Sequence, residues 1–505
     1  MTQTSPQTYQ GTDKLLFGII LGVLAFWLFA QTTLNISPQM AADLGIEQNL
    51  MNIAVSITAL FSGIFIVVIG GISDRIGRVK VVQWGFWLSI VGSLAVGFAP
   101  AGALGTTFLM FGRILQGLSA AFIMSASLAL VKAYWAEGKP RQRAISLWSM
   151  GSWGGSGFAA LFGGLMASNV GWRYIFIISA VLTLIGWLMV RGTPESKVES
   201  KGGFKFDLLG IGTFLVTMIA LQIVATQGSK IGWTDPITLG LSAVAVIFFI
   251  IFFKVEAGNK NAFINFKLFD NRIYTGATIS NFMLNGIAGM IIVSMLLLQL
   301  GGQMSAQAAG MLTLGYAISI VAFIRVGEKL LQKFGSRKPM IWGCLISGLS
   351  IALLLPTNLL LEDYRILAII SYILLGVGLA FYATPSTDAA LSNLPDDQAA
   401  AGAGIYKMAS SLGGSFGVAI SAAIFTALNA NDASVQWLQG VITFVGRQDN
   451  LATREAAMVA LGFNLMLVFV AILTIMLTIP RGKKSDAKPV EVKAPALPNG
   501  QEATA

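Results

Sequence analysis

The sequence predicts an all-α membrane protein. Of its 505 residues, 55% are hydrophobic and only 11% are charged, whereas soluble domains carry about a quarter charged residues. Many apolar runs reach the ~20 residues that a helix needs to cross a bilayer. The charged residues gather between these runs. A bundle of helices solvated by lipid accounts for all of these observations.

Fourteen apolar segments follow one another along the chain, each long enough to be a transmembrane helix. They cover approximately residues 15–36, 51–72, 80–99, 105–131, 143–167, 172–190, 207–227, 235–253, 274–299, 306–325, 339–357, 365–385, 400–428 and 456–480. An even number of spans returns the chain to the side on which it began. We therefore expect fourteen transmembrane helices with both termini on one side.

Lys and Arg are distributed unequally between the two sides of the predicted bundle. Of the 33 such residues, 26 lie in segments on the side of the N-terminus and 5 on the other side. Arg113 and Lys407 lie inside spans. Because cytoplasmic loops carry the excess of positive charge, we expect both termini in the cytoplasm. The net charge of +10 then reflects membrane topology and does not indicate a nucleic-acid partner.

Two turns of the sequence resemble each other. Residues 74–80 follow the second span and residues 332–338 follow the tenth, and both turns contain a polar residue, a cation, a spacer and a glycine. Aligning them superposes spans 1–6 on spans 9–14 and leaves spans 7 and 8 as an inserted pair. This 6+2+6 arrangement predicts two bundles around a cavity at the membrane midplane. The alternative is that glycine and cations mark any tight cytoplasmic turn.

The predicted organisation has five parts. They are a cytoplasmic N-terminal tail (1–14), an N-terminal six-helix bundle (15–191), a linker with the inserted helices 7 and 8 (192–272), a C-terminal six-helix bundle (273–480) and a disordered cytoplasmic tail (481–505). The outer loop 429–455 is long and contains apolar residues. We expect it to pack on the outer surface, with a substrate gate as the alternative.

Three motifs connect this pattern to a known family. The turn after the second span reads Gly71-x-x-Asp74-Arg75-x-Gly77-Arg78, the fourth span contains Arg113-x-x-Gln116-Gly117, and the thirteenth contains Gly404-Ile-Tyr406-Lys407-Met408. With these motifs, nearly the whole chain except the tail and the 429–455 loop resembles the major facilitator superfamily. Within it, the chain is similar to the fourteen-span drug:proton antiporters, and most closely to Nor-type quinolone and multidrug efflux pumps.

The resemblance implies a major facilitator fold and proton-coupled export of drugs by alternating access. It also implies a multi-pass location in a bacterial cytoplasmic membrane, with small-molecule drugs, protons and membrane lipid as partners and a monomeric state. The runner-up is a dedicated exporter or importer of a single amphiphilic metabolite on the same fold. No nucleotide-binding loop and no catalytic constellation occurs, so we expect neither ATP drive nor enzymatic activity.

No cofactor or metal is expected. The chain has no histidine and one cysteine, Cys344, which lies in an apolar run. Metal clusters need several such ligands at short spacing.

The resemblance assigns gating to the first motif, at Gly71, Asp74, Arg75, Gly77 and Arg78. Asp74 can meet a helix N-terminus or a cation across the two bundles, and the glycines permit close approach. A carboxylate at a helix N-terminus gains ~0.3–1 kcal/mol, and up to ~2 kcal/mol when partly buried. A few such contacts would bias the transporter toward an outward-open state, and protonation or a ligand could release them.

Arg113 is the central residue of the second motif. An arginine inside a span costs at least ~2.5–3.5 kcal/mol on insertion scales, so it needs polar company and a reason to be there. In the family this position is implicated in proton coupling. The alternative is an arginine that ties helices together.

The chain departs from the family in two places. The fifth span has Gly155-Ser156 and Ala159-Ala160 where glycine–proline pairs are expected, although Gly163-Gly164 are present. The first span has Gln31 where fourteen-span pumps commonly carry an aspartate, and glutamine cannot carry a proton. Whatever couples transport to protons here is a different group.

Lys407 is the remaining candidate. We find no Asp or Glu near the middle of any span, so the deep ionisable residues are Arg113 and Lys407. A desolvated ammonium can release its proton near neutral pH, whereas a guanidinium keeps its charge. We therefore assign proton coupling to Arg113, Lys407 and Asp74. The alternative for Lys407 is that it reaches water or pairs with Asp388 or Asp397.

A cavity whose fixed charges are basic suits zwitterionic or anionic aromatic drugs, such as a quinolone with its carboxylate. Apolar, aromatic and amide side chains would form the rest of such a site. The predicted substrate-binding residues are Phe26, Trp27, Gln31, Asn35, Met150, Trp153, Asn281, Phe282, Asn285, Tyr382, Tyr406 and Met408, with Trp148 and Met290 as further cavity candidates. For any one of them, helix packing or lipid contact is the alternative.

Overall fold

The computed structural model describes residues 9–197, 207–259, 264, 266–359, 361–430, 438, 440–445 and 450–481. All regular elements in this part of the chain are helices. Most of the predicted tail 481–505 lies outside the described residues. Twelve helices in the described part are long and apolar enough to cross a membrane.

The first half of the chain forms a body of closely packed helices, hereafter the N-body. Its elements are α1 (Asp13–Leu24), the π-helix η1 (Ala25–Ala30), α2 (Thr33–Leu44), α3 (Gln48–Ile76), α4 (Arg78–Gly97), α5 (Ala103–Tyr134), α6 (Lys139–Ser149), the π-helix η2 (Met150–Gly154), α7 (Gly155–Asn169) and α8 (Trp172–Val190). The interior of the N-body is apolar, and fully buried Phe86 and Trp148 are among its largest side chains.

The second half forms the C-body. Its elements are the 3-10 helix η3 (Phe266–Asp270), α11 (Arg272–Gly286), α12 (Gly289–Leu296), the π-helix η4 (Leu297–Gly301), α13 (Ala306–Leu312), α14 (Leu314–Phe334), α15 (Arg337–Leu354), α16 (Leu361–Ser392), the 3-10 helix η5 (Asp396–Gln398), α17 (Ala399–Ala430) and α19 (Leu451–Thr478). Pro385 lies inside α16, so this helix continues past residue 385, where the predicted span 365–385 ends.

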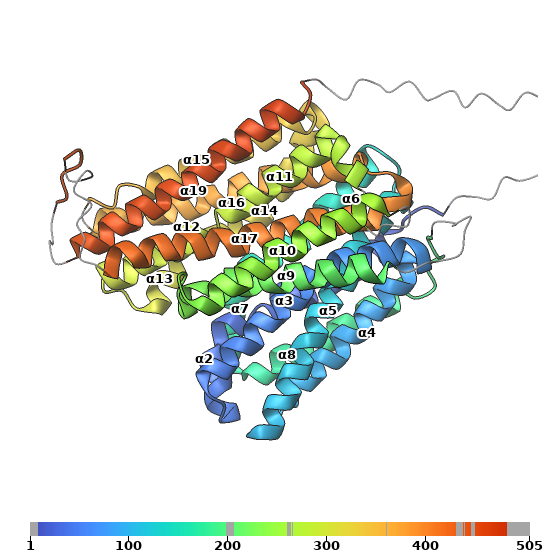
Figure 1. Cartoon of the computed structure of the whole chain (residues 1–505), viewed down its shortest axis with the longest axis horizontal. Coiled ribbons are helices and arrows are strands. Elements are labelled where there is room, and N and C mark those ends of the chain that lie inside the picture. Colours follow the sequence, from blue (N-terminus) through green and yellow to red (C-terminus); the bar gives the residue numbers. More distant parts are fainter. Residues whose placement is uncertain are drawn as a thin grey trace, which may run out of the picture.

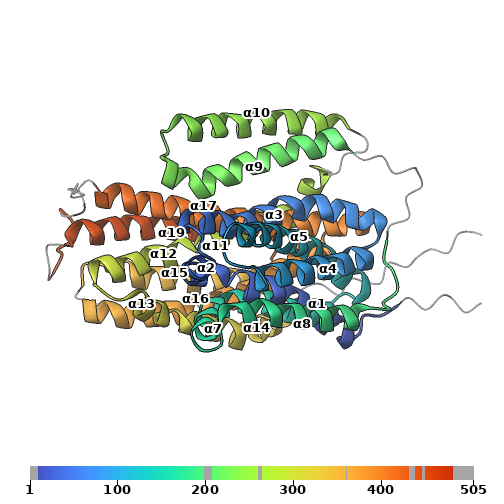
Figure 2. The ribbon, with the colours of Figure 1, turned by 90° about the horizontal axis from the view of Figure 1, so that it is seen from below.

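A hairpin of α9 (Leu208–Ile231) and α10 (Pro236–Gly258) stands beside the two bodies. Figure 2 shows it as a separate layer next to α3 and α17. α9 packs on both of these helices, and Gln222 donates to Ser415 of α17 at 3.3 Å. α10 packs mainly on α9 and exposes most of its apolar surface.

The two bodies converge at one end of the molecule and diverge toward the other (Figure 1). α3 packs on α17, and α6 and α7 pack on α14, so each seam joins an N-body helix to a C-body helix. We call the converging end the closed end. It is the end at which Asp74 of α3 lies against the start of α17.

Two of the predicted spans differ from the twelve candidate membrane helices. The segment expected at 143–167 is a helical run in which η2 separates α6 from α7, and the segment expected at 207–227 is α9. The π-helices interrupt the regular repeat, so neither half of the first run reaches membrane length by itself. The expected span 15–36 is likewise divided, by η1 and a turn at residues 31–32.

Candidate functional site

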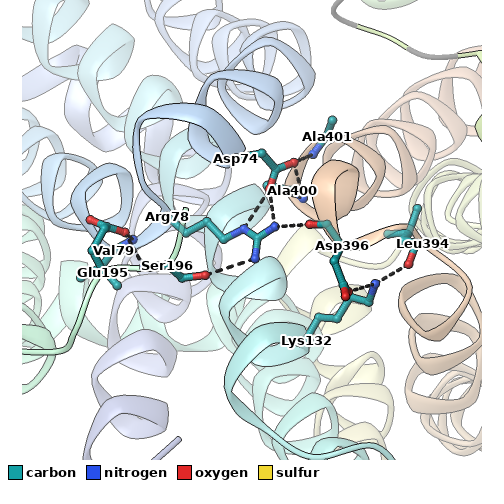
Figure 3. A network of polar contacts seen from close by, with 10 residues as sticks. All are labelled: Asp74, Arg78, Val79, Lys132, Glu195, Ser196, Leu394, Asp396, Ala400 and Ala401. Carbon is teal, nitrogen blue, oxygen red and sulfur yellow. Dashed lines mark hydrogen bonds and ion pairs between the residues drawn. The ribbon is translucent and has the colours of Figure 1, made fainter. Parts of the chain in front are cut away.

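Asp74 joins the two bodies at the closed end. Its carboxylate accepts the backbone N–H of Ala400 at 3.1 and 2.9 Å and that of Ala401 at 3.1 Å. These are first-turn residues of α17, whose N–H groups have no partner within the helix. Asp74 is 2% exposed, so this carboxylate caps a helix of the other body in a site from which water is excluded (Figure 3).

Arg78 neutralises Asp74 and reaches the C-body itself. Its Nε donates to Asp74 at 2.8 Å, and its Nη2 donates to the Asp396 carbonyl at 2.6 Å. Its Nη1 donates to Ser196 Oγ, in the segment after α8, at 3.2 Å. One buried guanidinium therefore connects the two bodies and the start of the linker (Figure 3).

Lys132, near the end of α5, makes a second connection between the bodies. Its Nζ lies 2.8 Å from Asp396 Oδ1 and also donates to the Leu394 carbonyl. Lys132 is buried, whereas the Asp396 side chain is exposed to solvent. The turn before α17 is thus held by both Arg78 and Lys132.

Glu195 stabilises the turn between α3 and α4. Its carboxylate accepts the N–H of Val79 at 2.8 Å and that of Lys80 at 3.0 Å, and so caps the start of α4. Gly77 has φ +124°, and a Cβ there would lie 2.5 Å from the Glu195 carboxyl carbon. Both the backbone conformation and the space require glycine at this position.

The closest approach of α3 and α17 occurs at Gly70 and Gly404. A Cβ at Gly70 would lie 2.5 Å from the Ala400 carbonyl oxygen, and a Cβ at Gly404 would lie 2.6 Å from that of Ile66. The sequence motif pointed to Gly71 as the glycine of close approach, but the contact falls on its neighbour. Arg75 of the same motif is exposed.

Arg113 is fully buried, at 0% exposure, inside the N-body. Its guanidinium donates to the carbonyls of Ala30 at 2.8 Å and Ala54 at 3.1 Å, and to Thr33 Oγ1 and Gln116 Oε1 at 3.0 and 2.8 Å. All of these acceptors are neutral, and no carboxylate lies within 4.0 Å among the described residues. The arginine ties η1, α2 and α3 to α5 while it keeps an uncompensated charge.

The π-helix η1 supplies one of these acceptors. Gln31 N–H donates to the Phe26 carbonyl at 3.0 Å, five residues back, and the helix then breaks at residues 31–32. At this break the Ala30 carbonyl receives Arg113 and the Thr33 hydroxyl. π-Helices are rare and are frequently found at functional sites.

Lys407 crosses from the C-body to the N-body. Its Nζ lies 4.4 Å from the centre of the Trp148 ring of α6, and Trp148 is fixed by a 2.9 Å hydrogen bond to Ser127 of α5. Lys407 is 7% exposed. Neither Asp388 nor Asp397 lies within ion-pair distance of it in the described structure, so the predicted alternative pairing is absent there.

Acidic side chains are buried as well, which corrects the expectation that the buried fixed charges are only basic. Asp74, Glu328, Asp388 and Glu455 are all at most 4% exposed. Each lies within about six residues of an end of its helix, where hydrogen-bond donors of turns and loops are near. Because these carboxylates lie near helix ends and not near the middle of a span, their sequence positions did not single them out.

The predicted polar residues of the C-body satisfy one another. Asn281 Nδ2 donates to the Tyr406 carbonyl at 2.9 Å and to Ser410 Oγ at 2.5 Å, and its Oδ1 accepts from Asn285 at 2.9 Å. The Tyr406 hydroxyl donates to Ser386 at 2.9 Å. These bonds fix both α11 and α16 to α17 at Tyr406, the residue directly before Lys407.

The predicted substrate-binding residues fall into two groups. Phe26, Asn281, Tyr382 and Tyr406 are buried, as are Trp148 and Met290, whereas Trp27, Gln31, Met150, Trp153, Phe282, Asn285 and Met408 are half-buried and Asn35 is exposed. Five of them (Phe26, Trp27, Gln31, Met150 and Trp153) lie in or beside η1 and η2, which contact each other in the N-body. Asn35 lies in α2, Trp148 in α6 and Met290 in α12, and the others lie on α11, α16 and α17. Their role in substrate binding stays a prediction.

The outer loop is bound to the C-body where it is described. Arg454 donates to the carbonyls of Thr357 at 2.7 Å and Val445 at 2.9 Å, and its guanidinium lies 5.2 Å from the centre of the Phe444 ring. Leu438, Phe444 and Met458 form a small apolar cluster. These contacts are consistent with packing on the outer surface.

Sequence reasoning did not identify Lys132, Glu195 or Asp396. No motif marks them, because each acts through a contact with a residue far along the chain.

The chain matches a family model described as Major Facilitator Superfamily, over residues 15–418 and 274–498. It is 43% identical over 481 residues to a "Quinolone resistance protein NorB" of Staphylococcus aureus (strain MRSA252), covering 95% of this chain and 99% of the relative. The same-named protein of strain COL is 42% identical over the same length.

Two solved structures share the fold. The proton:xylose symporter XylE superposes with a TM-score of 0.61 at 15% identity, covering 93% of this chain and 96% of that one. The human organic anion transporter MFSD10 superposes with a TM-score of 0.54 at 14% identity, covering 92% and 98%.

Proposed function

Because the chain belongs to the major facilitator superfamily, we propose that it exports small aromatic drugs, quinolones among them, in exchange for protons. The likeness to quinolone resistance proteins along nearly the whole chain supports this substrate class. Transport then proceeds by alternating access, in which the N-body and the C-body rock about a central binding region.

The single observation that carries the transport mechanism is the cap that Asp74 places on α17 of the opposite body. A buried carboxylate at a helix N-terminus contributes up to ~2 kcal/mol, and Arg78, which pairs with Asp74 at 2.7 Å, adds a hydrogen bond of its own to the Asp396 carbonyl of the C-body. Opening this end requires that the hydrogen bonds from Asp74 and Arg78 to the C-body break together, whereas the ion pair between Asp74 and Arg78 can stay intact within the N-body. The closed end is therefore a latch with two defined states, as alternating access requires.

We assign the closed end to the cytoplasmic side. The excess of Lys and Arg lies in the turns on this side, and cytoplasmic loops carry such an excess. The structure then corresponds to a state that faces outward. Both termini lie in the cytoplasm, and α6–η2–α7 and α9 complete the twelve candidate spans to fourteen in a 6+2+6 order.

We assign the proton- and drug-responsive step to Lys407. A cation over an aromatic face in a desolvated site gains ~2 kcal/mol or more, which is less than a buried ion pair would lose on separation. Lys407 can therefore leave Trp148 for the carboxylate of an arriving drug, or release its proton. Either event weakens a contact between the bodies on the same helix that Asp74 caps.

Transport in everted membrane vesicles tests the proposal. A pH gradient should drive uptake of a fluorescent quinolone by the wild type, and a protonophore should abolish it. Lys407→Met should reduce the uptake about tenfold or more and remove its pH dependence. Uptake that persists in the presence of the protonophore would contradict proton-coupled export. Unchanged quinolone transport and pH dependence in Lys407→Met would contradict export through this residue. Uptake of a single amphiphilic metabolite with no drug transport would favour the dedicated exporter.

A further inference from the structure

One exposed face of the N-body combines tryptophans and cations near the closed end. Lys80, Trp84 and Trp87 lie at positions i, i+4 and i+7 of α4, and therefore on one side of that helix. Trp84 is 44% exposed and Trp87 is 45% exposed. In a soluble protein such exposure would be costly, but the ring of tryptophan is suited to the boundary between lipid tails and headgroups.

The end of α8 adds to the same face. Trp187 lies with its ring centre 5.1 Å from that of Trp87, in an edge-on arrangement. α4 and α8 pack on each other, and α4 starts at the end of the molecule where α8 stops. Lys80 and Arg191 are therefore both displaced from the tryptophan pair toward the closed end. We call Lys80, Trp84, Trp87, Trp187 and Arg191 the α4–α8 patch.

Each cation of the patch rests on a tryptophan. Lys80 Nζ lies 5.2 Å from the centre of the Trp84 ring, and the Arg191 guanidinium lies 5.5 Å from that of Trp187. Neither of these cations has an ion pair in the described structure. The one nearby carboxylate in a described contact, that of Glu195, binds the N–H groups of Val79 and Lys80. The cationic side chains keep their capacity for an anion.

From this arrangement we propose that the α4–α8 patch binds the headgroup of an anionic phospholipid. The phosphate contacts Lys80 and Arg191, while Trp84, Trp87 and Trp187 lie against the glycerol and the upper part of the acyl chains. Basic residues at a membrane surface attract anionic lipid, and exposed tryptophans fix the depth at which the helix sits.

The corresponding turn of the C-body places its tryptophan in a different environment. In the C-body, Lys338 and Trp342 take the places of Lys80 and Trp84 relative to the glycine of each turn, Gly335 and Gly77. There, however, Lys333 and Lys338 both lie over the ring of Phe334, against which Trp342 packs edge-on at 5.1 Å. Trp342 is thus half-buried against Phe334, whereas Trp84 and Trp87 of the N-body are exposed.

Native mass spectrometry of the purified full-length protein tests the proposal, with phosphatidylglycerol or phosphatidylcholine added to the micelles. The wild type should retain more phosphatidylglycerol than phosphatidylcholine. Since each basic residue near a membrane contributes roughly fivefold to the binding of anionic lipid, Lys80→Gln and Arg191→Gln should each reduce this preference by about that factor. The double variant should lose nearly all of it.

The matched control is the double variant Lys139→Gln with Lys329→Gln, which removes the same charge from two exposed lysines that contact no aromatic ring in the described structure. It should keep the preference for phosphatidylglycerol within about twofold. An equal loss in this control would assign the effect to net charge and overturn the proposal. Equal retention of both lipids by the wild type would overturn it as well.

Discussion

The turns that follow α3 and α14 occupy corresponding places in the two bodies but do different work. Both contain a glycine with positive φ, Gly77 at +124° and Gly335 at +74°. In the first turn, Asp74 accepts hydrogen bonds from the opposite body. In the second, the corresponding Gln332 donates to Glu328 of its own helix at 3.0 Å. The two turns thus share a glycine with positive φ, but only the turn after α3 makes the hydrogen bonds to the opposite body among the residues described here.

The second seam, between α6 of the N-body and α14 of the C-body, has weaker polar contacts than the α3–α17 seam. Glu328 pairs with Arg325 of its own helix and interacts electrostatically with Arg143 of α6. Arg143 in turn pairs with Asp13 of the N-body at 2.5 Å, and both of these side chains are partly exposed. Because exposed ion pairs contribute little, the closed state depends mainly on the α3–α17 seam.

The largest expected effect is that of Asp74→Asn. Removing one partner of a buried ion pair and its charged hydrogen bonds costs about 2–4 kcal/mol, so drug export in everted vesicles should fall more than about tenfold. The control is Gln332→Ala, which leaves every hydrogen bond between the bodies in place and should stay within about twofold of the wild type. Equal losses in the two variants would remove the distinction between the seams.

Lys407→Met should come next, since it breaks the contact with Trp148 on the helix that Asp74 caps. A desolvated cation–π contact is worth ~2 kcal/mol, and export should fall about tenfold or more. Lys407→Arg keeps the charge but not the ability to release a proton. It should retain the contact and lose the pH dependence of transport. If Lys407→Arg kept the normal pH profile, the proton would be carried elsewhere.

Gly70→Ala should have a smaller effect than Lys407→Met, and one of a different kind from Gly327→Ala in the C-body. The added methyl would lie 2.5 Å from the Ala400 carbonyl and press α3 away from α17, at a cost of about 1–3 kcal/mol. Cysteine cross-linking between α3 and α17 should become slower. Gly327→Ala meets the Ala380 carbonyl within the C-body, so it should lower the melting temperature and leave the cross-linking rate unchanged. A reversed pattern would contradict the assignment of the latch.

The smallest effect concerns an ion pair within one body. Arg173 and Trp172 both donate to Asp43, at the end of α2, and these hydrogen bonds hold the pKa of its carboxyl below the ordinary value of 3.8. The bonds therefore stabilise the fold above that value, and the contribution is lost as the pH falls through the depressed pKa. Asp43→Asn should lower the melting temperature slightly at neutral pH, lose this difference in acid, and leave export unchanged.

Most of the architecture could be predicted because lipid imposes simple rules. Apolar length and the two glycine turns indicated a helical membrane protein of this superfamily, and the family and structural matches confirm it. The interruptions at η1, η2 and η4 could not be predicted, because a π-helix depends on tertiary packing and leaves no clear pattern in hydrophobicity. The fourteen-span count stays a prediction beside the twelve candidate helices of the described residues.

The candidate site was predicted unevenly. Asp74 was expected to meet a helix N-terminus, and the structure places it on that of α17. Lys407 was expected to be deep, but its neighbour is the ring of Trp148 and not a carboxylate. Lys132, Glu195 and Asp396 escaped notice because single-chain patterns do not reveal contacts between residues more than a hundred positions apart.

The π-helix at residues 25–30 has a consequence for how this chain tolerates insertion and deletion. A single extra residue in a helix rotates the segment before it by about 100° relative to the segment after it. Deleting one residue here would restore regular α-helical winding and take the Ala30 carbonyl away from Arg113. The burial of Arg113 thus depends on the π-helical winding of residues 25–30.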